Sequence, residues 1–241
     1  MANHSTSSAR EGLSGGKQLS GGAQLSEGSG ALDYVAPKGC QKCPRLYNFI
    51  TQQKGANPAW YNGAVPAFGA NDAQIVIVGL APGLRGANAT GRPFTGDFAG
   101  ETLYQALLKH GFASGDYQKH AQDGLQLHNL RITNAVKCVP PQNKPTADEV
   151  NQCRDAYLID ELARMKNLKV ILALGGIAHK AMIKTFGKSQ SAHPFGHLKH
   201  YQMSDDITLL DSYHCSRYNV QTNRLTIAMF DKVMLQLKTM I

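Results

Sequence analysis

The feature that most constrains this chain is a long loop, residues 79–97, that directly follows four consecutive β-branched residues. That apolar run, residues 75–78, predicts a buried parallel strand. Open α/β sheets bind their ligands at the carboxyl ends of such strands. The loop contains glycines for close backbone approach, two arginines, one aromatic residue (Phe94) and one carboxylate (Asp97). A simple connection would be shorter, so we expect residues 79–97 to form part of a functional site.

Strand and helix patterns alternate along the rest of the chain. They predict strands at 131–136, 169–174 and 207–210, and helices at 99–110, 146–165, 177–186 and 226–239. Alternation of this kind indicates parallel βαβ units, with helices covering both faces of the sheet. We therefore predict an α/β fold, a three-layer α/β/α sandwich with a central parallel sheet of about four strands.

The first 33 residues differ from the remainder in composition. They are rich in Ser and Gly and contain no aromatic residue, so they cannot bury enough apolar area to offset chain entropy. We expect residues 1–33 to be a disordered tail and residues 34–241 to form one domain. The tail has no apolar segment typical of a signal peptide, and the sequence contains no run of 18 apolar residues. We therefore expect no membrane partner.

The charge of the chain indicates a polyanionic partner. The sequence contains 25 Lys and Arg against 17 Asp and Glu, a formal charge of +8. The tail is slightly acidic, so the remaining body carries about +9. A basic body attracts phosphate backbones and speeds association with them.

Cysteine spacing provides a second signal. Cys40 and Cys43 form a C-x2-C pair, and Cys138 and Cys153 form a second pair. Four thiolates from two pairs suit a tetrahedral Zn²⁺ or an iron–sulfur cluster, and spacing alone does not separate these two. The alternatives are a redox C-x-x-C motif, a disulfide pair or unrelated buried thiols. A thioredoxin-like C-x-x-C follows a strand, and disulfides need an oxidising compartment, so the sequence favours a metal site.

A polar segment, residues 211–225, follows the strand predicted at 207–210 and would reach the same edge of the sheet as the loop. His214 can hydrogen-bond a carbonyl oxygen or an anion that develops on it. Arg217, Tyr218 and Asn219 suit contacts to phosphates and bases. The alternative for His214 is a structural or surface histidine, but its place beside Arg217 and Tyr218 favours a functional role.

These segments resemble the motifs of uracil-DNA glycosylases. The resemblance is carried by residues 79–97, 133–138 and 214–217, together with the four paired cysteines in matching order. It is strongest to the iron–sulfur branch and, within it, to the family-5 (type B) group. Most glycosylases of this kind carry a polar residue soon after the first glycine of the loop, whereas this chain has the apolar sequence 80–83, as type B does. The resemblance covers residues 34–241.

The resemblance implies a hydrolase of N-glycosyl bonds that removes uracil, and other deaminated bases, from DNA and leaves an abasic site, the first step of base excision repair. It implies that Asp97 positions water or stabilises the oxocarbenium-like sugar, and that His214 hydrogen-bonds the base oxygen. Asn134 matches the uracil edge, unless it bonds only to the local backbone. Phe94 provides an aromatic platform for the extruded base, unless it is a core residue that caps the sheet.

The remaining implied residues fall into three sets. The substrate-binding set adds backbone from the start of the loop, and the DNA-binding set lies after the last strand. These sets are Gly79, Ala81, Pro82 and Phe94 for the substrate, and Ser216, Arg217, Tyr218 and Asn219 for DNA. Cys40, Cys43, Cys138 and Cys153 would hold a structural [4Fe-4S] cluster, with Zn²⁺ as the alternative, and leave Cys215 free. The implied protein is a monomer that works on DNA in the cytoplasm, at the nucleoid.

Two other functions stay open. One is a glycosylase whose main substrate is hypoxanthine or another deaminated base. The other is a basic, metal-containing nucleic-acid-binding module without catalysis, which would show no turnover. A ferredoxin-like electron carrier fits poorly, because such proteins are usually small and acidic whereas this body is large and basic.

Overall fold

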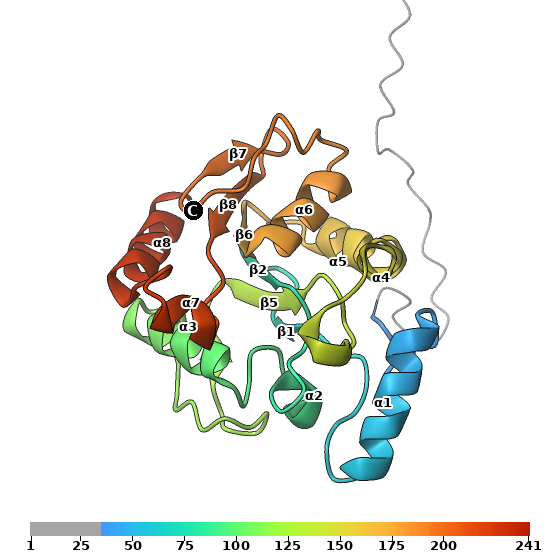
Figure 1. Ribbon diagram of the computed structural model, residues 1–241. Coiled ribbons are helices and arrows are strands. Elements are labelled where there is room, and N and C mark those ends of the chain that lie inside the picture. The colour runs from blue at the N-terminus through green and yellow to red at the C-terminus, as the bar shows by residue number, and fades with distance from the viewer. Residues whose placement is uncertain (1–34) are drawn as a thin grey trace, which may run out of the picture. The chain divides into compact units, whose positions relative to one another are not determined.

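A six-stranded sheet forms the centre of the computed structural model, which describes residues 35–241 (Figure 1). The tail predicted at residues 1–33 lies outside the described residues. The strands lie in the order β1-β5-β2-β6-β8-β7. In that order they are β1 Phe68–Gly69, β5 Leu130–Asn134, β2 Ile75–Gly79, β6 Val170–Leu174, β8 Thr208–Ser212 and β7 His200–Gln202.

The four central strands, β5, β2, β6 and β8, are parallel, which confirms the predicted core of the sheet. The two edge strands are antiparallel to their neighbours and were not predicted. They are only two and three residues long, too short to carry a hydrophobic period in the sequence. The strand expected at 131–136 ends at Asn134, although backbone bonds from Ala135 and Val136 continue its pairing with the chain after β2.

Helices cover both faces of this sheet, which confirms the three-layer architecture (Figure 1). One face packs against α1, α4, α5 and α6, and the other against α3 and α8. Alternate residues of β2 divide between the two layers: Val76 and Val78 face the first, and Ile75 and Ile77 the second. The helices are α1 Pro44–Ala56, α2 Ala87–Thr90, α3 Phe98–Lys109, α4 Ala147–Cys153, α5 Ile159–Arg164, α6 Gly176–Thr185, α7 Arg217–Gln221 and α8 Ile227–Thr239.

Local chemistry explains where these helices begin. Asp97, Thr146, Ser216 and Thr226 are N-caps whose side chains accept a backbone hydrogen bond. The helix predicted at 146–165 forms, but a π-helical turn at Arg154–Leu158 separates α4 from α5. The prediction contained no helix at α1, which begins directly after the C-x2-C pair. Within residues 35–241, no helix has the length and apolar character needed to cross a membrane.

Candidate active site

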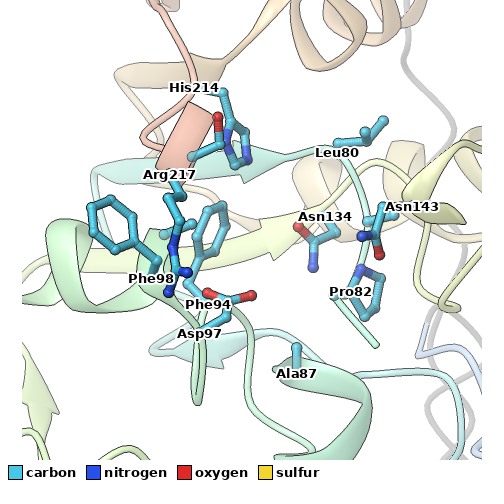
Figure 2. A pocket seen from close by; sticks show the side chains of 14 residues that line it. Leu80, Pro82, Ala87, Phe94, Asp97, Phe98, Asn134, Asn143, His214 and Arg217 are labelled. Atoms are coloured by element: carbon cyan, nitrogen blue, oxygen red, sulfur yellow. The ribbon is translucent and has the colours of Figure 1, made fainter. Parts of the chain in front are cut away.

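A pocket of about 520 Å³ opens where β2 and β5 end, beside the segment that follows β8 (Figure 2). Its position at the carboxyl edge of the parallel strands is the one expected for a ligand site in this architecture. Asp97, Phe94 and Arg217 lie on one side of the pocket, and Asn134, Asn143 and Pro82 on the other. The lining is completed by Leu80, Ala81, Gly83, Ala87, Phe98, Ala99, His214 and Ser216.

Asp97 is held at the first turn of α3. Its Oδ1 atom accepts a hydrogen bond from the backbone N–H of Gly100 at 2.9 Å, so the carboxylate caps the helix. The helix dipole also favours a negative charge at this end. Around Oδ2 the loop consists of glycine: a Cβ atom at Gly86 would overlap this oxygen, and one at Gly83 would lie 2.8 Å from it. The loop therefore surrounds the carboxylate with backbone alone.

Asn134 and Phe94 meet across Gly79, which explains the role of that glycine. Gly79 and Asn134 are register partners at the ends of β2 and β5. A Cβ atom at Gly79 would overlap the Asn134 amide and the Phe94 ring, so only glycine lets both side chains approach. Gly79 itself is buried beneath the pocket and does not line it, unlike Ala81 and Pro82.

The Asn134 side chain is buried, with only 3% of the residue exposed. Its Oδ1 atom has no hydrogen-bond partner among the residues that the structure describes. A buried carbonyl oxygen without a partner is costly, and such groups in native proteins usually serve a ligand or a function. This observation argues against the alternative that Asn134 only bonds to the local backbone.

His214 lies at the upper rim of the pocket in Figure 2. Burial lowers the pKa of His214, and the negative charge of Asp97 opposes this shift without overcoming it. The imidazole is therefore neutral at neutral pH and can donate one N–H. Its ring lies 5.9 Å from the ring of Phe94, with an angle of 27° between the planes. The Nδ2 atom of Asn219 donates to the His214 carbonyl at 2.8 Å and fixes this backbone.

The predicted DNA-binding residues occupy α7 and its cap, but they do not act alike. Ser216 and Arg217 line the pocket, and the Arg217 guanidinium lies 5.4 Å from the centre of the Phe98 ring. Tyr218 is 70% exposed and projects outside the pocket. Asn219 is used to hold His214, so its side chain is not available in the way that the sequence suggested.

Arg92 has a structural position that the sequence did not reveal. It is 4% exposed, and its guanidinium donates two hydrogen bonds of 2.7 Å to the carboxylate of Asp123. Its Nε atom donates to Thr95 at 2.8 Å. The guanidinium also lies near three aromatic rings, about 5 to 6 Å from their centres. Arg92 therefore anchors the loop 79–97 to the body and faces away from any ligand.

Three pocket residues outside the loop 79–97 escaped the sequence prediction: Phe98, Ala99 and Asn143. Asn143 follows two prolines, and both it and Gln142 have positive φ angles, 57° and 56°. Phe98 directly follows Asp97 and forms part of the same wall. The position of Asn143 after the strand β5 was a usable signal, because the carboxyl end of a parallel strand leads to the site edge.

The four paired cysteines line one small buried cavity between α1, α4 and the segment after β5. The cavity lining contains Cys40, Cys43, Cys138 and Cys153 and no Asp, Glu or His. Burial and the other three thiols raise the pKa of Cys138. Within the described residues, no three His, Cys, Asp or Glu side chains are arranged so that they could hold a metal ion.

Hydrogen bonds already point toward these sulfur atoms. The backbone N–H of Lys137 donates to Sγ of Cys153 at 3.3 Å. The hydroxyl of Tyr157 lies 3.2 Å from Sγ of Cys40. Cys215 lies apart from this group, fully buried under the active-site segment, with its Sγ 3.4 Å from the Ala99 carbonyl.

Comparison with known proteins agrees with this geometry. Residues 66–238 match the family described as the uracil DNA glycosylase superfamily. A type-5 uracil-DNA glycosylase of Thermus thermophilus is 42% identical over 205 residues, which cover 83% of this chain and 92% of the relative. A type-5 enzyme of Pyrobaculum aerophilum is 35% identical over 199 residues, 81% and 86% of the two chains. One of Mycobacterium tuberculosis is 34% identical over 206 residues, 83% and 77%. The chain therefore belongs to the uracil-DNA glycosylase superfamily and, within it, to the type-5 group.

Proposed function

We propose that this protein is a DNA glycosylase that hydrolyses the N-glycosidic bond of uracil in DNA and leaves an abasic site, as the first step of base excision repair. The observation that carries the proposal is one pocket that holds a carboxylate, Asp97, and two groups for a base, Asn134 and His214. Breaking this bond places positive charge on the sugar and negative charge on the base, and the pocket supplies a partner for each. The names of the type-5 relatives support the same reaction.

The roles of the side chains follow from their positions. Asp97, fixed by its cap on α3, stabilises the cationic sugar and orients the attacking water. His214, as a neutral imidazole, donates a hydrogen bond to the base oxygen on which charge develops. The unpartnered amide of Asn134 pairs with the edge of the extruded uracil. Phe94 serves as the platform for the base, although its other side belongs to the core.

The test of this function uses DNA duplexes that contain one uracil or one hypoxanthine. The purified protein is incubated with each duplex, and abasic sites are then cleaved by alkali and resolved on a gel. Strand cleavage at uracil supports the proposal. Cleavage only at hypoxanthine would favour the other glycosylase function. Binding without cleavage of either duplex would identify a non-catalytic binding module.

The exposed end of α7 is suited to separate a base from its stack. Tyr218 presents an exposed aromatic ring beside the pocket, and Arg217 places a cation at its rim. Enzymes that act on a base must first extrude it, and side chains inserted into the stack assist this step. We assign Ser216, Arg217 and Tyr218 to the DNA interface and Asn219 to the support of His214.

Arg217→Ala is expected to lower excision from matched A·U pairs by at least about tenfold and from mismatched G·U pairs by much less, because mismatched bases cost less to extrude. Single-turnover assays on the two duplexes measure this difference. Lys166→Ala is the matched control, since Lys166 precedes β6 at the opposite edge of the sheet. Equal losses on both duplexes would contradict a role of this segment in extrusion.

We propose that the cysteine cavity holds a structural [4Fe-4S] cluster. The donor set consists of four thiols with no competing carboxylate or imidazole, as in a Cys₄ iron–sulfur site. Cys40 and Cys43 before α1, Cys138 after β5 and Cys153 in α4 would hold this cluster, which would then link the three segments. Zinc remains the alternative, and the absorbance and metal content of the purified protein distinguish it from the cluster.

The protein purified without oxygen is expected to be brown, with broad absorbance at about 400 nm. Cys153→Ala is expected to lose this colour and to melt at a lower temperature, because a structural metal site contributes to folding free energy. Cys215→Ala is the matched control, since Cys215 is equally buried but lies outside the cavity. A colourless wild-type protein that contains one zinc ion would refute the cluster.

We also propose that the catalytic domain spans residues 34–241, with the tail 1–33 outside it. The range matched by the family, residues 66–238, lies within these limits. We propose a monomer that works on DNA in the cytoplasm, at the nucleoid; the names of the type-5 relatives support the DNA substrate.

A further inference from the structure

Tyr117 reaches the back of the active-site loop from a segment that no sequence motif identified. Its hydroxyl accepts a hydrogen bond from the backbone N–H of Gly96 at 3.2 Å and donates a longer one, 3.4 Å, to the carbonyl of Phe94. These two bonds enclose the three residues that directly precede Asp97. Burial raises the pKa of Tyr117, so the hydroxyl keeps the proton that it donates.

The segment that Tyr117 holds needs support from outside. Phe94 has a φ angle of 52° and Gly96 one of 93°. A bulky residue in the left-handed region is strained and persists only when its surroundings fix it. This backbone conformation places the Phe94 ring in the pocket wall and directs the chain toward Asp97, whose carboxylate lines the same pocket.

Tyr117 is itself firmly placed. Its ring stacks on Tyr104, with ring centres 4.7 Å apart and 29° between the planes. The hydroxyl of Tyr104 donates to the carbonyl of Pro93 at 2.8 Å, one residue before the strained position. The first turn of α3 packs at the same point, because a Cβ atom at Gly100 would overlap the Phe94 carbonyl and lie 2.9 Å from the Tyr117 hydroxyl.

We propose that Tyr117 is a positioning residue for base excision, whose hydroxyl fixes the Phe94 platform and the Asp97 carboxylate in their reactive arrangement. This inference rests on the proposed function. The hydroxyl touches neither the pocket nor the reacting atoms, so it acts through these two residues. Small displacements of reacting groups have large effects on rate, because a shift of about 1 Å can cost about 100-fold.

Tyr117→Phe removes the hydroxyl and keeps the stacked ring. We expect it to lower the single-turnover rate of uracil excision by about 10- to 100-fold. The Kd for a duplex containing 2′-fluoro-2′-deoxyuridine, in which the glycosidic bond is resistant to cleavage, is expected to stay within about twofold of wild type, because no DNA contact is lost. The melting temperature is expected to fall by only a few degrees, as for the loss of one side-chain hydroxyl.

Tyr201→Phe is the matched control, because it also removes a phenol that donates to a backbone carbonyl, that of Pro194, at a site away from the pocket. A wild-type rate in Tyr117→Phe would overturn the inference. A loss of rate accompanied by a similar fold-loss of binding, or by a fall in melting temperature well beyond a few degrees, would also overturn it, since it would show a structural role. Failure of the wild-type protein to excise uracil would instead refute the proposed function.

Discussion

Asp97→Asn is expected to lower the single-turnover rate of uracil excision by more than about 10³-fold, while binding to duplex DNA is retained. Asp97 is the only carboxylate that lines the pocket in the described part of the chain. An amide of the same shape keeps the α3 cap but cannot neutralise a cationic sugar. No neighbouring residue can replace the lost charge, because the loop around Oδ2 is glycine.

His214→Ala provides the comparison for this result. Loss of one positioned hydrogen-bond donor typically costs about 10²–10³ in rate, and Asn134 remains to bind the base. The effect of His214→Ala should therefore be smaller than that of Asp97→Asn. Rapid-quench assays under enzyme excess measure both rates. A nearly wild-type Asp97→Asn together with an inactive His214→Ala would show that the catalytic charge comes from another segment.

Asp123→Ala is expected to lower the free energy of unfolding by about 3–5 kcal/mol, because it leaves the buried Arg92 cation without its partner. The two side chains are only 5% and 0% exposed and are joined at 2.7 Å. Denaturant titration measures the change. Glu101→Gln is the matched control: it breaks the exposed pair with Lys119, and such pairs contribute about 1 kcal/mol or less. Equal effects of both substitutions would contradict the anchoring role of Arg92.

The same ion pair predicts how stability depends on pH. Burial alone would raise the pKa of Asp123, but hydrogen bonds from Arg92 and from two backbone amides outweigh it and lower the pKa to about 2. A carboxylate with a lowered pKa stabilises the fold above its unfolded pKa and loses this contribution as the pH falls. Stability should therefore decline from about pH 4 toward pH 2. Asp123→Asn should remove this part of the decline.

The sequence predicted the parts of the fold that local patterns specify. The β-branched runs identified the four parallel strands, and the Thr146–Glu149 capping box identified the start of α4. The edge strands β1 and β7 depend on pairing with distant residues, and their two or three residues carry no period of their own. A prediction from sequence patterns cannot find a strand that is stabilised only by pairing with the adjacent strand.

In the candidate site, too, the sequence predicted what local patterns specify and missed what depends on distant contacts. Asp97 and His214 lie in segments that follow parallel strands, and Asn134 ends the strand β5, so all three lie at one edge of the sheet. The sequence could not show that Arg92 turns inward, because its partner Asp123 lies 31 positions away in a segment without a motif. It also could not separate Asn219, which supports His214, from its neighbours on α7.

The glycines around Asp97 also bear on how this loop can diversify over evolutionary time. A side chain at Gly86 displaces the carboxylate, and one at Gly83 crowds it, so substitutions at either position trade any new contact against the reaction itself. Between them, Leu84 packs partly against the core, whereas Arg85 is exposed. The loop thus combines two positions that must remain glycine, Gly83 and Gly86, with an exposed position, Arg85, at which the side chain can change more freely during evolution.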